Sequence, residues 1–259
     1  MRPFISIGIP TYEMGGKGKE FLMELLNSIK IQSFKDFEVI ISDHSKGNQI
    51  KKLITDSKYF FKVVYLKNEM MYGNPSNNIN NIIETAKGEY IKFMFQDDLL
   101  NGKNSISSLV SEIKKNKKSN WFVSGSFQIK NQMKLNPMMP IYNHKMHIGY
   151  NSISSPSVLT IKNNSFKIKF NEEFKWLLDC VYYKDCYLKF GEPHIVNELL
   201  IINRISKTQL SNILTFKEKY FEILKSIRKY DKGLMKIYTF TEVSIKFSIN
   251  LILAKINKL

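Results

Sequence analysis

The sequence predicts an α/β protein with a mixed, mainly parallel sheet flanked by helices and a helical C-terminal extension. Three observations lead to this class. Short apolar runs alternate with segments of helical apolar spacing through the first hundred residues, which is the pattern of strands joined by helices. Polar residues follow the end of each apolar run. Beyond residue 205 the pattern is helical and strongly basic.

The first hundred residues contain four predicted strands separated by helices. The strands are expected over residues 4–9, 38–42, 61–66 and 90–95. Helices are expected over 19–31, around 50–54 and over 76–86, the last with Ser76 as its N-cap. Helices of this length between strands favour a parallel sheet, whose ligands bind beyond the carboxyl ends of the strands. The polar residues expected at that edge are Tyr12, Glu13, Asp43, Asn68, Asp97 and Asp98.

The pattern is less regular after residue 100. A helix over 105–115 is followed by an irregular span, 130–156, rich in Asn, Met, Pro and His. Further strands are expected over 121–129, 157–162 and 194–205, and a further helix over 174–191. We therefore divide the chain into one domain, residues 1–209, with halves 1–100 and 101–209, and an extension, 210–259.

The formal net charge is +16, from 39 Lys and Arg residues against 23 Asp and Glu residues. This balance favours an anionic partner, and nucleic acid, a phosphorylated substrate or an acidic membrane surface would each qualify. The excess is mostly scattered Lys, which also fits a protein without such a partner. A nucleic-acid-binding protein would show clustered Arg and exposed aromatic residues, so we expect no nucleic-acid partner and keep that class as an alternative.

The cysteines, the histidines and the hydropathy pattern exclude several other classes. Cys180 and Cys186 have the spacing of neither a zinc site nor a redox pair, so we expect reduced thiols. His144 and His147 are three residues apart, but no third zinc ligand is evident. The N-terminus lacks the apolar core of a signal peptide, and no window has the ~18–20 apolar residues of a transmembrane helix. We expect a cytoplasmic protein.

Two adjacent carboxylates, Asp97 and Asp98, follow the fourth predicted strand. An Asp-Asp pair often opens a turn or caps the next helix. The alternative is a divalent cation site, because Mg²⁺ and Mn²⁺ favour oxygen ligands and bind one or two carboxylates together with substrate phosphates. A bound cation would also offset the repulsion between the two like charges.

Four motifs then occur in an order typical of one enzyme family. They are SIGIPTYE, LLNSIKIQSFKDFEVIISDHS, GNPSNNINNIIETAKGEYIKFMFQDDLL and FKWLLDCVYYKDC. Over residues 4–209 the chain resembles family-2 glycosyltransferases, inverting enzymes of the GT-A fold that act in bacterial polysaccharide and lipopolysaccharide synthesis. The resemblance implies a Rossmann-like sheet, with a nucleotide-binding half over 1–100 and an acceptor-binding half over 101–209.

The resemblance also implies which residues contact the nucleotide sugar. The loop containing Tyr12 lies against the base in the family, with Glu13 here in place of an Asn. Asp43 matches the acid that bonds uracil or ribose, while Ser42 replaces the acid before it. Ser76, Asn78 and Asn80 match a motif that shapes the nucleotide pocket. The residues expected at the nucleotide sugar are Pro10, Tyr12, Glu13, Asp43, Asn68, Asn78, Gln96, Asp97 and Arg204.

The family's Asp-x-Asp-Asp motif reads Phe95-Gln96-Asp97-Asp98 here, so its first Asp, which often touches the ribose, is absent. The resemblance implies that Asp97 or Asp98 binds the metal, Mn²⁺ or Mg²⁺. Such a cation neutralises negative charge that builds on the leaving diphosphate.

Asp179 aligns with the family's catalytic carboxylate, with Leu178 where a Glu often stands. As general base it would take the proton of the acceptor hydroxyl. Asp185 is its nearest rival, but a separation of six residues places the two side chains ~240° apart around a helix. A role for Asp179 as a helix-face cap or bridge is the structural alternative.

Three later features complete the predicted site. Arg204 lies in NRISKTQLS, which resembles a segment that folds over the diphosphate, with Ser206 in place of a His, so that this function either passes to Arg204 or Lys207 or is lost. Trp176 is expected to stack on an acceptor sugar, with a buried core position as the alternative. The basic helix 244–259 is expected either on an anionic membrane surface or packed against the domain or in an oligomer.

Together these features predict transfer of a sugar, with inversion, from a nucleotide-diphosphate sugar to a glycan or lipid-linked acceptor. A UDP-sugar is the expected donor, and surface-glycan synthesis at the inner face of the cytoplasmic membrane is the expected setting. Because Ser42, Phe95 and Ser206 depart from the family pattern, a catalytically silent relative that binds nucleotide sugars is the alternative.

Overall fold

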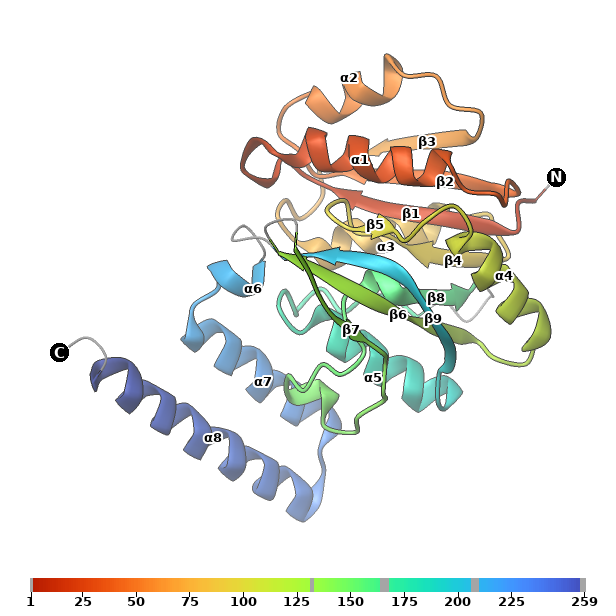
Figure 1. Ribbon diagram of the computed structural model, residues 1–259. Helices are drawn as coiled ribbons and strands as arrows, with labels where there is room; N and C mark the ends of the chain where they lie inside the picture. The colour runs from red at the N-terminus through yellow and green to blue at the C-terminus, as the bar shows by residue number, and fades with distance from the viewer. Residues whose placement is uncertain (1, 131–132, 164–167, 206–209, 257–259) are drawn as a thin grey trace.

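A single sheet of nine strands organises the part of the chain that the structure describes (Figure 1). This computed structural model describes residues 2–130, 133–163, 168–205 and 210–256. Across the sheet the order is β3-β2-β1-β4-β8-β6-β9-β5, with β7 paired to β6. The strands are Ile5–Thr11 (β1), Phe37–Asp43 (β2), Lys62–Lys67 (β3), Tyr90–Phe93 (β4), Leu99–Leu100 (β5), Trp121–Lys130 (β6), Met133–Met138 (β7), Leu159–Lys162 (β8) and His194–Arg204 (β9).

The sheet combines parallel and antiparallel pairs as the sequence predicts. β3, β2, β1 and β4 are parallel throughout, and β6 also pairs in parallel with β9. β8 is antiparallel to both β4 and β6 and so joins the two parts of the sheet. The predicted fold class is confirmed. Because β1, β2 and β4 run the same way, the loops that follow them meet at one edge.

Helices follow most strands of the first half and carry their apolar residues into the core. The helices are Gly18–Lys30 (α1), Gln49–Thr55 (α2), Pro75–Thr85 (α3), Ser105–Lys115 (α4), Leu178–Phe190 (α5), Leu210–Ile213 (α6), Phe216–Tyr230 (α7) and Gly233–Ile256 (α8), with short 3₁₀ turns at Met14–Gly16, Met146–Ile148 and Pro156–Val158. On α1, Leu22, Leu25 and Ile29 are fully buried, which is the i, i+3, i+7 spacing of one helix face.

The N-cap predicted for α3 is wrong by two residues. The cap is Asn74, whose side chain accepts a hydrogen bond from the Asn77 amide, and Pro75 takes the first helical position. Proline suits that position because its missing N–H would have no partner there. Ser76 is thereby placed inside the first turn, where its hydroxyl is free to bond elsewhere.

Two elements of the second half differ from the sequence-based prediction. The span 130–156 contains a strand, β7, which pairs antiparallel with β6 although its sequence is rich in Met, Asn and Pro. The helix predicted over 174–191 begins only at Leu178. The residues before it form an irregular segment, so that Trp176 precedes the helix rather than lying on it.

The C-terminal helices α7 and α8 lie side by side at the end of the molecule away from β1, β2 and β3 (Figure 1). Phe216 of α7 stacks on Phe247 of α8, with ring centroids 4.9 Å apart. A small apolar cluster of Ile148, Ile227 and Val243 joins both helices to the turn at Met146–Ile148. This turn belongs to the second half of the domain, so α7 is attached to that half.

Candidate functional site

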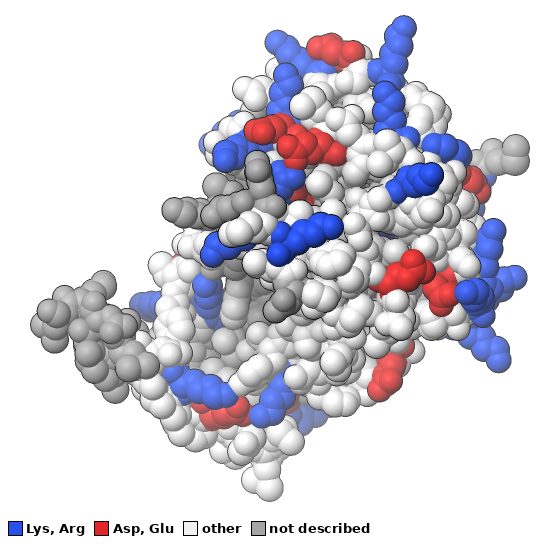
Figure 2. Space-filling view, in the orientation of Figure 1, with Lys and Arg blue, Asp and Glu red and all other residues white. Residues whose placement is uncertain are grey.

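A cavity of about 810 Å³ lies beyond the carboxyl ends of β1 and β4. Its walls come from the loops after β1 and β4, the start of α3, residues 149–156, residues 175–180 and the end of β9. Figure 2 shows this face of the molecule hollowed between the C-terminal helices and the sheet. Both halves of the domain contribute to the cavity, which has the size of a small-molecule site.

Most of the predicted site residues line this one cavity. They are Pro10, Tyr12, Asn78, Gln96, Asp97, Asp98, Trp176, Asp179 and Arg204. Three predicted residues do not line the cavity: Glu13, Asp43 and Asn68. Each instead accepts hydrogen bonds from the backbone of a neighbouring loop. The structure thus brings together residues that are up to 194 positions apart in the sequence (Pro10 to Arg204). Their individual roles toward a substrate remain predictions.

Gln96 fastens the loop after β4 to the loop after β1. Its Oε1 accepts the Tyr12 amide at 2.7 Å, and its Nε2 donates to the Tyr12 carbonyl at 3.1 Å and to the Gly18 carbonyl at 2.9 Å. Gly18 has to be small here, because a Cβ at this position would lie 2.1 Å from the Tyr12 carbonyl oxygen. Gln96 therefore fixes the position of Tyr12, whose ring lines the cavity.

Asp43 is fully buried, and its carboxylate is engaged by protein groups. It accepts hydrogen bonds from the Tyr65 hydroxyl at 2.7 Å and from the Ser45 amide at 2.8 Å. Asn78 lies beside it, donating to the Thr11 carbonyl at 3.2 Å and accepting from the Ser42 hydroxyl at 2.6 Å. Ser42 thus acts as a hydrogen-bond donor to α3.

Asn68 and Glu13 hold the two loops at the rim of the first half. The Oδ1 of Asn68 accepts the Met70 amide at 3.1 Å. Glu13 accepts the amides of Lys46 and Gly47 and the hydroxyl of Tyr72. Partial burial raises the pKa of Glu13, but the hydrogen bonds from its own amide, Lys46 and Gly47 outweigh this and lower it. Glu13 is therefore a charged link between the loops after β1 and β2.

Asp97 and Asp98 differ in how their carboxylates are used. Asp98 is buried, and its oxygens accept the Ser155 hydroxyl at 3.0 Å and the Arg204 amide at 3.1 Å. Within the described residues, Asp97 accepts a hydrogen bond only from its own amide. Burial raises the pKa of both carboxyls, and the charge of Asp97 raises that of Asp98 further. Asp98 therefore holds Ser155 and the Arg204 backbone in place, while the carboxylate of Asp97 is available to a ligand in the cavity.

A buried lysine beneath these acids was not identified from the sequence. Lys92 of β4 is 1% exposed and donates to the backbone carbonyls of Ser157 and Leu159. Burial lowers the pKa of Lys92 to about 7, and the charge of Asp98 opposes this shift. The only signal in the sequence was a single Lys inside the apolar run YIKFMF.

Asp179 lies in the first turn of α5, in the cavity wall that the second half of the domain forms. Its Oδ2 accepts the Asn151 side-chain amide at 2.7 Å, and its Oδ1 accepts the Cys180 backbone amide at 2.7 Å. Burial raises the pKa of Asp179 to about 6, although these hydrogen bonds lower it. The rival, Asp185, instead pairs with Lys229 and Tyr230 of α7. Asn151 was not identified from the sequence, because it lies in the span predicted to be irregular.

The motif at the start of α3 holds the segment that leads to Asp179. The Ser76 hydroxyl donates to the Phe174 carbonyl at 3.0 Å. Asn80 donates to the Phe170 carbonyl at 2.9 Å and accepts the Phe170 amide at 2.8 Å. Of the three residues predicted to shape the nucleotide pocket, only Asn78 lines the cavity; Ser76 and Asn80 position the 170–174 segment.

Arg204 and Trp176 both line the cavity but contact different elements. The Arg204 guanidinium pairs with Glu24 and lies 4.5 Å from the centre of the Phe21 ring, both on α1. Trp176 is partly buried against Gly149, and Lys219 lies 5.7 Å from the centre of its indole. Trp176 is thus a partly exposed wall residue. Ser206 and Lys207 lie outside the described residues.

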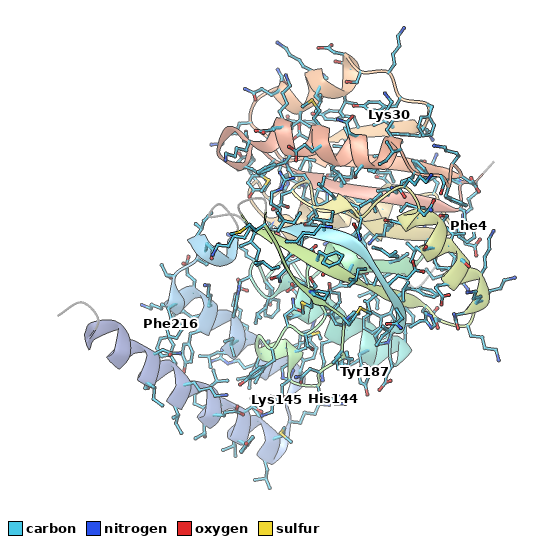
Figure 3. All side chains as sticks on the ribbon, in the orientation of Figure 1. Phe4, Lys30, His144, Lys145, Tyr187 and Phe216 are labelled. Atoms are coloured by element: carbon cyan, nitrogen blue, oxygen red, sulfur yellow. The ribbon has the colours of Figure 1, made fainter. Side chains whose placement is uncertain are left out.

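His144 and His147, the two histidines that are three residues apart, contact protein side chains. The His144 ring lies 5.2 Å from the ring of Tyr187 (Figure 3). His147 pairs with Asp231 at 3.1 Å. Within the described residues, no three acidic, His or Cys side chains converge as a metal cluster would require.

The donor groups at Asp97 fit a divalent cation that takes only part of its ligands from the protein. Asp97 would supply one carboxylate, while Asp98 already accepts hydrogen bonds from Ser155 and Arg204. Mg²⁺ and Mn²⁺ are commonly bound by one or two carboxylates together with substrate phosphates and water. The site therefore matches a cation that binds together with a diphosphate.

Comparisons with known proteins agree with this architecture. A β-1,3-glucosyltransferase of Campylobacter jejuni, named for GalNAc(5)-diNAcBac-PP-undecaprenol, is 31% identical over 113 residues, or 42% of this chain. The match spans about a third (34%) of that relative's length. Residues 1–349 of Staphylococcus aureus TarS in complex with UDP-GlcNAc superpose with a TM-score of 0.66 at 20% identity, covering 92% of this chain and 71% of that TarS fragment.

A more distant structure shares the fold as well. The Pyrobaculum calidifontis mannosyltransferase PcManGT, in complex with GDP-Man and Mn²⁺, has a TM-score of 0.59 at 11% identity and covers 95% of this chain and 70% of PcManGT. Within the described residues, no helix is long and apolar enough to cross a bilayer. The family model for glycosyl transferase family 2 matches residues 6–183, about two thirds of the chain, and the protein belongs to this family.

Proposed function

We propose that the protein transfers a sugar from a nucleotide-diphosphate sugar to an acceptor hydroxyl with inversion. The observation that carries this proposal is that Asp97 and Asp179, from the two halves of the domain, line the same cavity of about 810 Å³. Two carboxylates on separate walls allow one to act at the leaving diphosphate and the other at the attacking hydroxyl. TarS, a relative by fold, has been crystallised with UDP and with UDP-GlcNAc, which supports a UDP-sugar donor.

On the donor side, the first half of the domain supplies a preformed pocket. Gln96 holds Tyr12 at one wall, where the residue is 42% exposed and its ring would be available to a nucleobase. Asp97 would hold Mn²⁺ or Mg²⁺, whose positive charge stabilises a departing diphosphate. The complex of PcManGT with Mn²⁺ supports this cofactor assignment.

On the acceptor side, Asp179 acts as general base. Its Oδ2 is oriented by Asn151 and its Oδ1 by the first turn of α5. A carboxylate with a pKa of about 6 is ionised at neutral pH and yet a better proton acceptor than an exposed aspartate. It would remove the proton of the hydroxyl as that oxygen attacks the anomeric carbon. Trp176 lines the same wall and would stack on the acceptor.

The C-terminal helices would place this reaction at a membrane. The name of the C. jejuni relative gives a lipid-linked acceptor, and TarS is named a poly(ribitol-phosphate) β-N-acetylglucosaminyltransferase. Residues 210–259 contain ten Lys and Arg residues against four acidic residues. We infer a role in surface-glycan synthesis, on a lipid-linked or polymeric acceptor, with the basic extension on an anionic lipid surface.

The test is titration calorimetry with UDP, with and without Mn²⁺, followed by a screen of nucleotide sugars for hydrolysis and transfer. We expect UDP to bind, binding to strengthen with Mn²⁺, and at least one donor to be turned over. Asp179→Asn should bind UDP with unchanged affinity and lose transfer by about 10³-fold, the middle of the range for general acid–base catalysis. Binding of UDP without turnover of any donor would favour the silent relative, and a chain that binds no nucleotide would refute the proposal.

A further inference from the structure

One acidic side chain of the C-terminal extension contacts the backbone that carries the catalytic segment. Glu222 of α7 accepts three consecutive amides, with Oε1 2.9 Å from the Lys175 nitrogen and Oε2 2.9 Å from the nitrogens of Trp176 and Leu177. These are the residues immediately before α5. The contact joins positions that are 45 to 47 residues apart in the chain.

The three amides need a partner because they precede the first turn of α5, whose own i→i−4 hydrogen bonds begin with the Val181 amide. Its N-cap is Leu177, which has no side-chain acceptor, and no side-chain cap is present. Unpaired amides at a helix start cost free energy, and the positive end of the helix dipole favours a carboxylate there. Glu222 thus supplies, from another helix, the acceptor for the three amides that lead into α5.

Helix α7 is fastened to the domain at further points, so Glu222 is held in place. The Ser226 hydroxyl donates to the His147 carbonyl. Tyr230 donates to the Asp185 carboxylate at 2.9 Å, and Lys229 pairs with the same carboxylate at 2.8 Å. These contacts are to the second half of the domain, which contains Asp179. They anchor α7 without touching the 175–177 backbone.

We propose that Glu222 is a positioning residue for the active site: it fixes the 175–177 backbone and thereby the acceptor wall formed by Trp176 and the base Asp179. The proposal rests on the proposed function for its consequence in catalysis. Asp179 lies two residues beyond the last amide that Glu222 binds, on a helix that starts there. A shift of about 1 Å in such a group is enough to reduce a rate ~100-fold. The C-terminal extension is then part of the catalytic unit, although the family match ends at residue 183.

The experiment compares Glu222→Ala and Glu222→Gln with Tyr230→Phe, all in the full-length chain. Tyr230→Phe removes a hydrogen bond that anchors α7 to Asp185 and leaves the three amides untouched, so it controls for general loosening of α7. The first readout is hydrogen exchange of the peptide covering 174–178, which needs no substrate. The others are kcat and KM for the acceptor and the dissociation constant for UDP.

We expect faster exchange at 174–178 in Glu222→Ala, an intermediate rate in Glu222→Gln, which keeps one acceptor oxygen, and the wild-type rate in Tyr230→Phe. In Glu222→Ala, kcat should fall about 10- to 100-fold while UDP affinity stays within about twofold, because the donor pocket is built by the other half. Glu222→Gln should fold even if Glu222→Ala does not, and should show part of both effects.

Fast exchange at 174–178 in the wild-type protein would overturn the proposal. So would an equal loss of kcat in Tyr230→Phe and the Glu222 variants, since that would mean that α7 acts only through overall stability. If the wild-type protein binds no nucleotide, the proposed function fails, while the exchange measurement still decides whether Glu222 holds the segment.

Discussion

At the residue scale, Asp179 combines burial with two hydrogen bonds that leave it ready to accept a proton. Its titratable neighbours Cys180 and Tyr183 are buried, and burial raises the pKa of each well above its usual value. Both therefore stay neutral over the physiological range. The charge that changes around neutral pH at this wall of the cavity is that of Asp179 itself, with its pKa raised to about 6 by burial.

This arrangement predicts the pH dependence of transfer. Asp179 works as a base only when ionised, so its ionisation should raise kcat through pH about 6. The Asn151 amide donates to the carboxylate and stabilises its charged form, so Asn151→Ala should raise the pKa of Asp179 and move the rise to higher pH by about one unit. A pH–rate profile of both proteins checks this. A lower rate without movement of the midpoint would show that Asn151 does not tune the base.

The sequence predicts the chemistry-bearing acids but not the residues that orient them. Asp97, Asp98 and Asp179 are recognisable because they follow a strand or stand in a motif. Asn151, Lys92 and Glu222 carry no such signal, because each acts through a partner between 28 and 67 positions away. Their roles depend on tertiary packing, which a single sequence does not display.

At the element scale, the first half of the fold follows from periodicity and the second half does not. Each parallel strand there is mostly apolar, and each helix has one apolar face. β7 has no such run, and its place comes from pairing with β6. The start of α5 is displaced to Leu178 because Ser76, Asn80 and Glu222 hold the preceding segment in an irregular conformation.

The close approach of α1 to the loop after β1 gives a prediction about one glycine. In Gly18→Ala the added Cβ would lie 2.1 Å from the Tyr12 carbonyl and 2.9 Å from Gln96 Nε2. Alanine favours helix by ~1 kcal/mol, but overpacking against backbone costs about 1–3 kcal/mol, so the net effect is destabilising. We expect a lower melting temperature and several-fold weaker UDP binding, because the Gln96 contacts that fix Tyr12 are displaced.

The matched control for this variant is Gly47→Ala, in the neighbouring loop. Its Cβ would meet no atom within 4 Å, so melting temperature and UDP binding should match the wild-type protein. Thermal denaturation and calorimetry measure both variants. Unchanged UDP affinity in a folded Gly18→Ala protein would mean that the Gln96 contacts do not shape the donor pocket.

At the scale of the whole molecule, α8 presents an apolar stripe on its outer side. α7 lies between α8 and the sheet (Figure 1), and Thr239 and Val243 of α8 are buried. On the other side, Leu234, Tyr238, Ile245 and Ile249 are 84%, 60%, 55% and 50% exposed. At ~100° per residue these four side chains fall within roughly 60° of arc. An exposed apolar stripe on a basic segment is what an interfacial helix requires.

We therefore predict that the full chain binds vesicles containing anionic lipid and binds neutral vesicles less, with the difference reduced by salt because screening weakens the attraction. Leu234→Ser combined with Ile245→Ser should abolish vesicle binding and leave turnover of a water-soluble acceptor unchanged. These substitutions are preferred to truncation near residue 210, because truncation would also remove Glu222 and its contacts with residues 175–177. Vesicle flotation measures the binding.

The matched control replaces two apolar residues of similar exposure elsewhere, Ile31→Ser with Leu188→Ser, which are 59% and 62% exposed. This control should bind vesicles as the wild-type chain does, because neither residue belongs to the stripe.

The alternative is that the stripe binds a second copy of the chain. If the wild-type protein is a dimer that ignores anionic vesicles, and Leu234→Ser with Ile245→Ser makes it monomeric, then the stripe is a subunit interface and the membrane role is refuted. Anionic binding that survives the double substitution would assign the attraction to the lysines alone, with no insertion of α8.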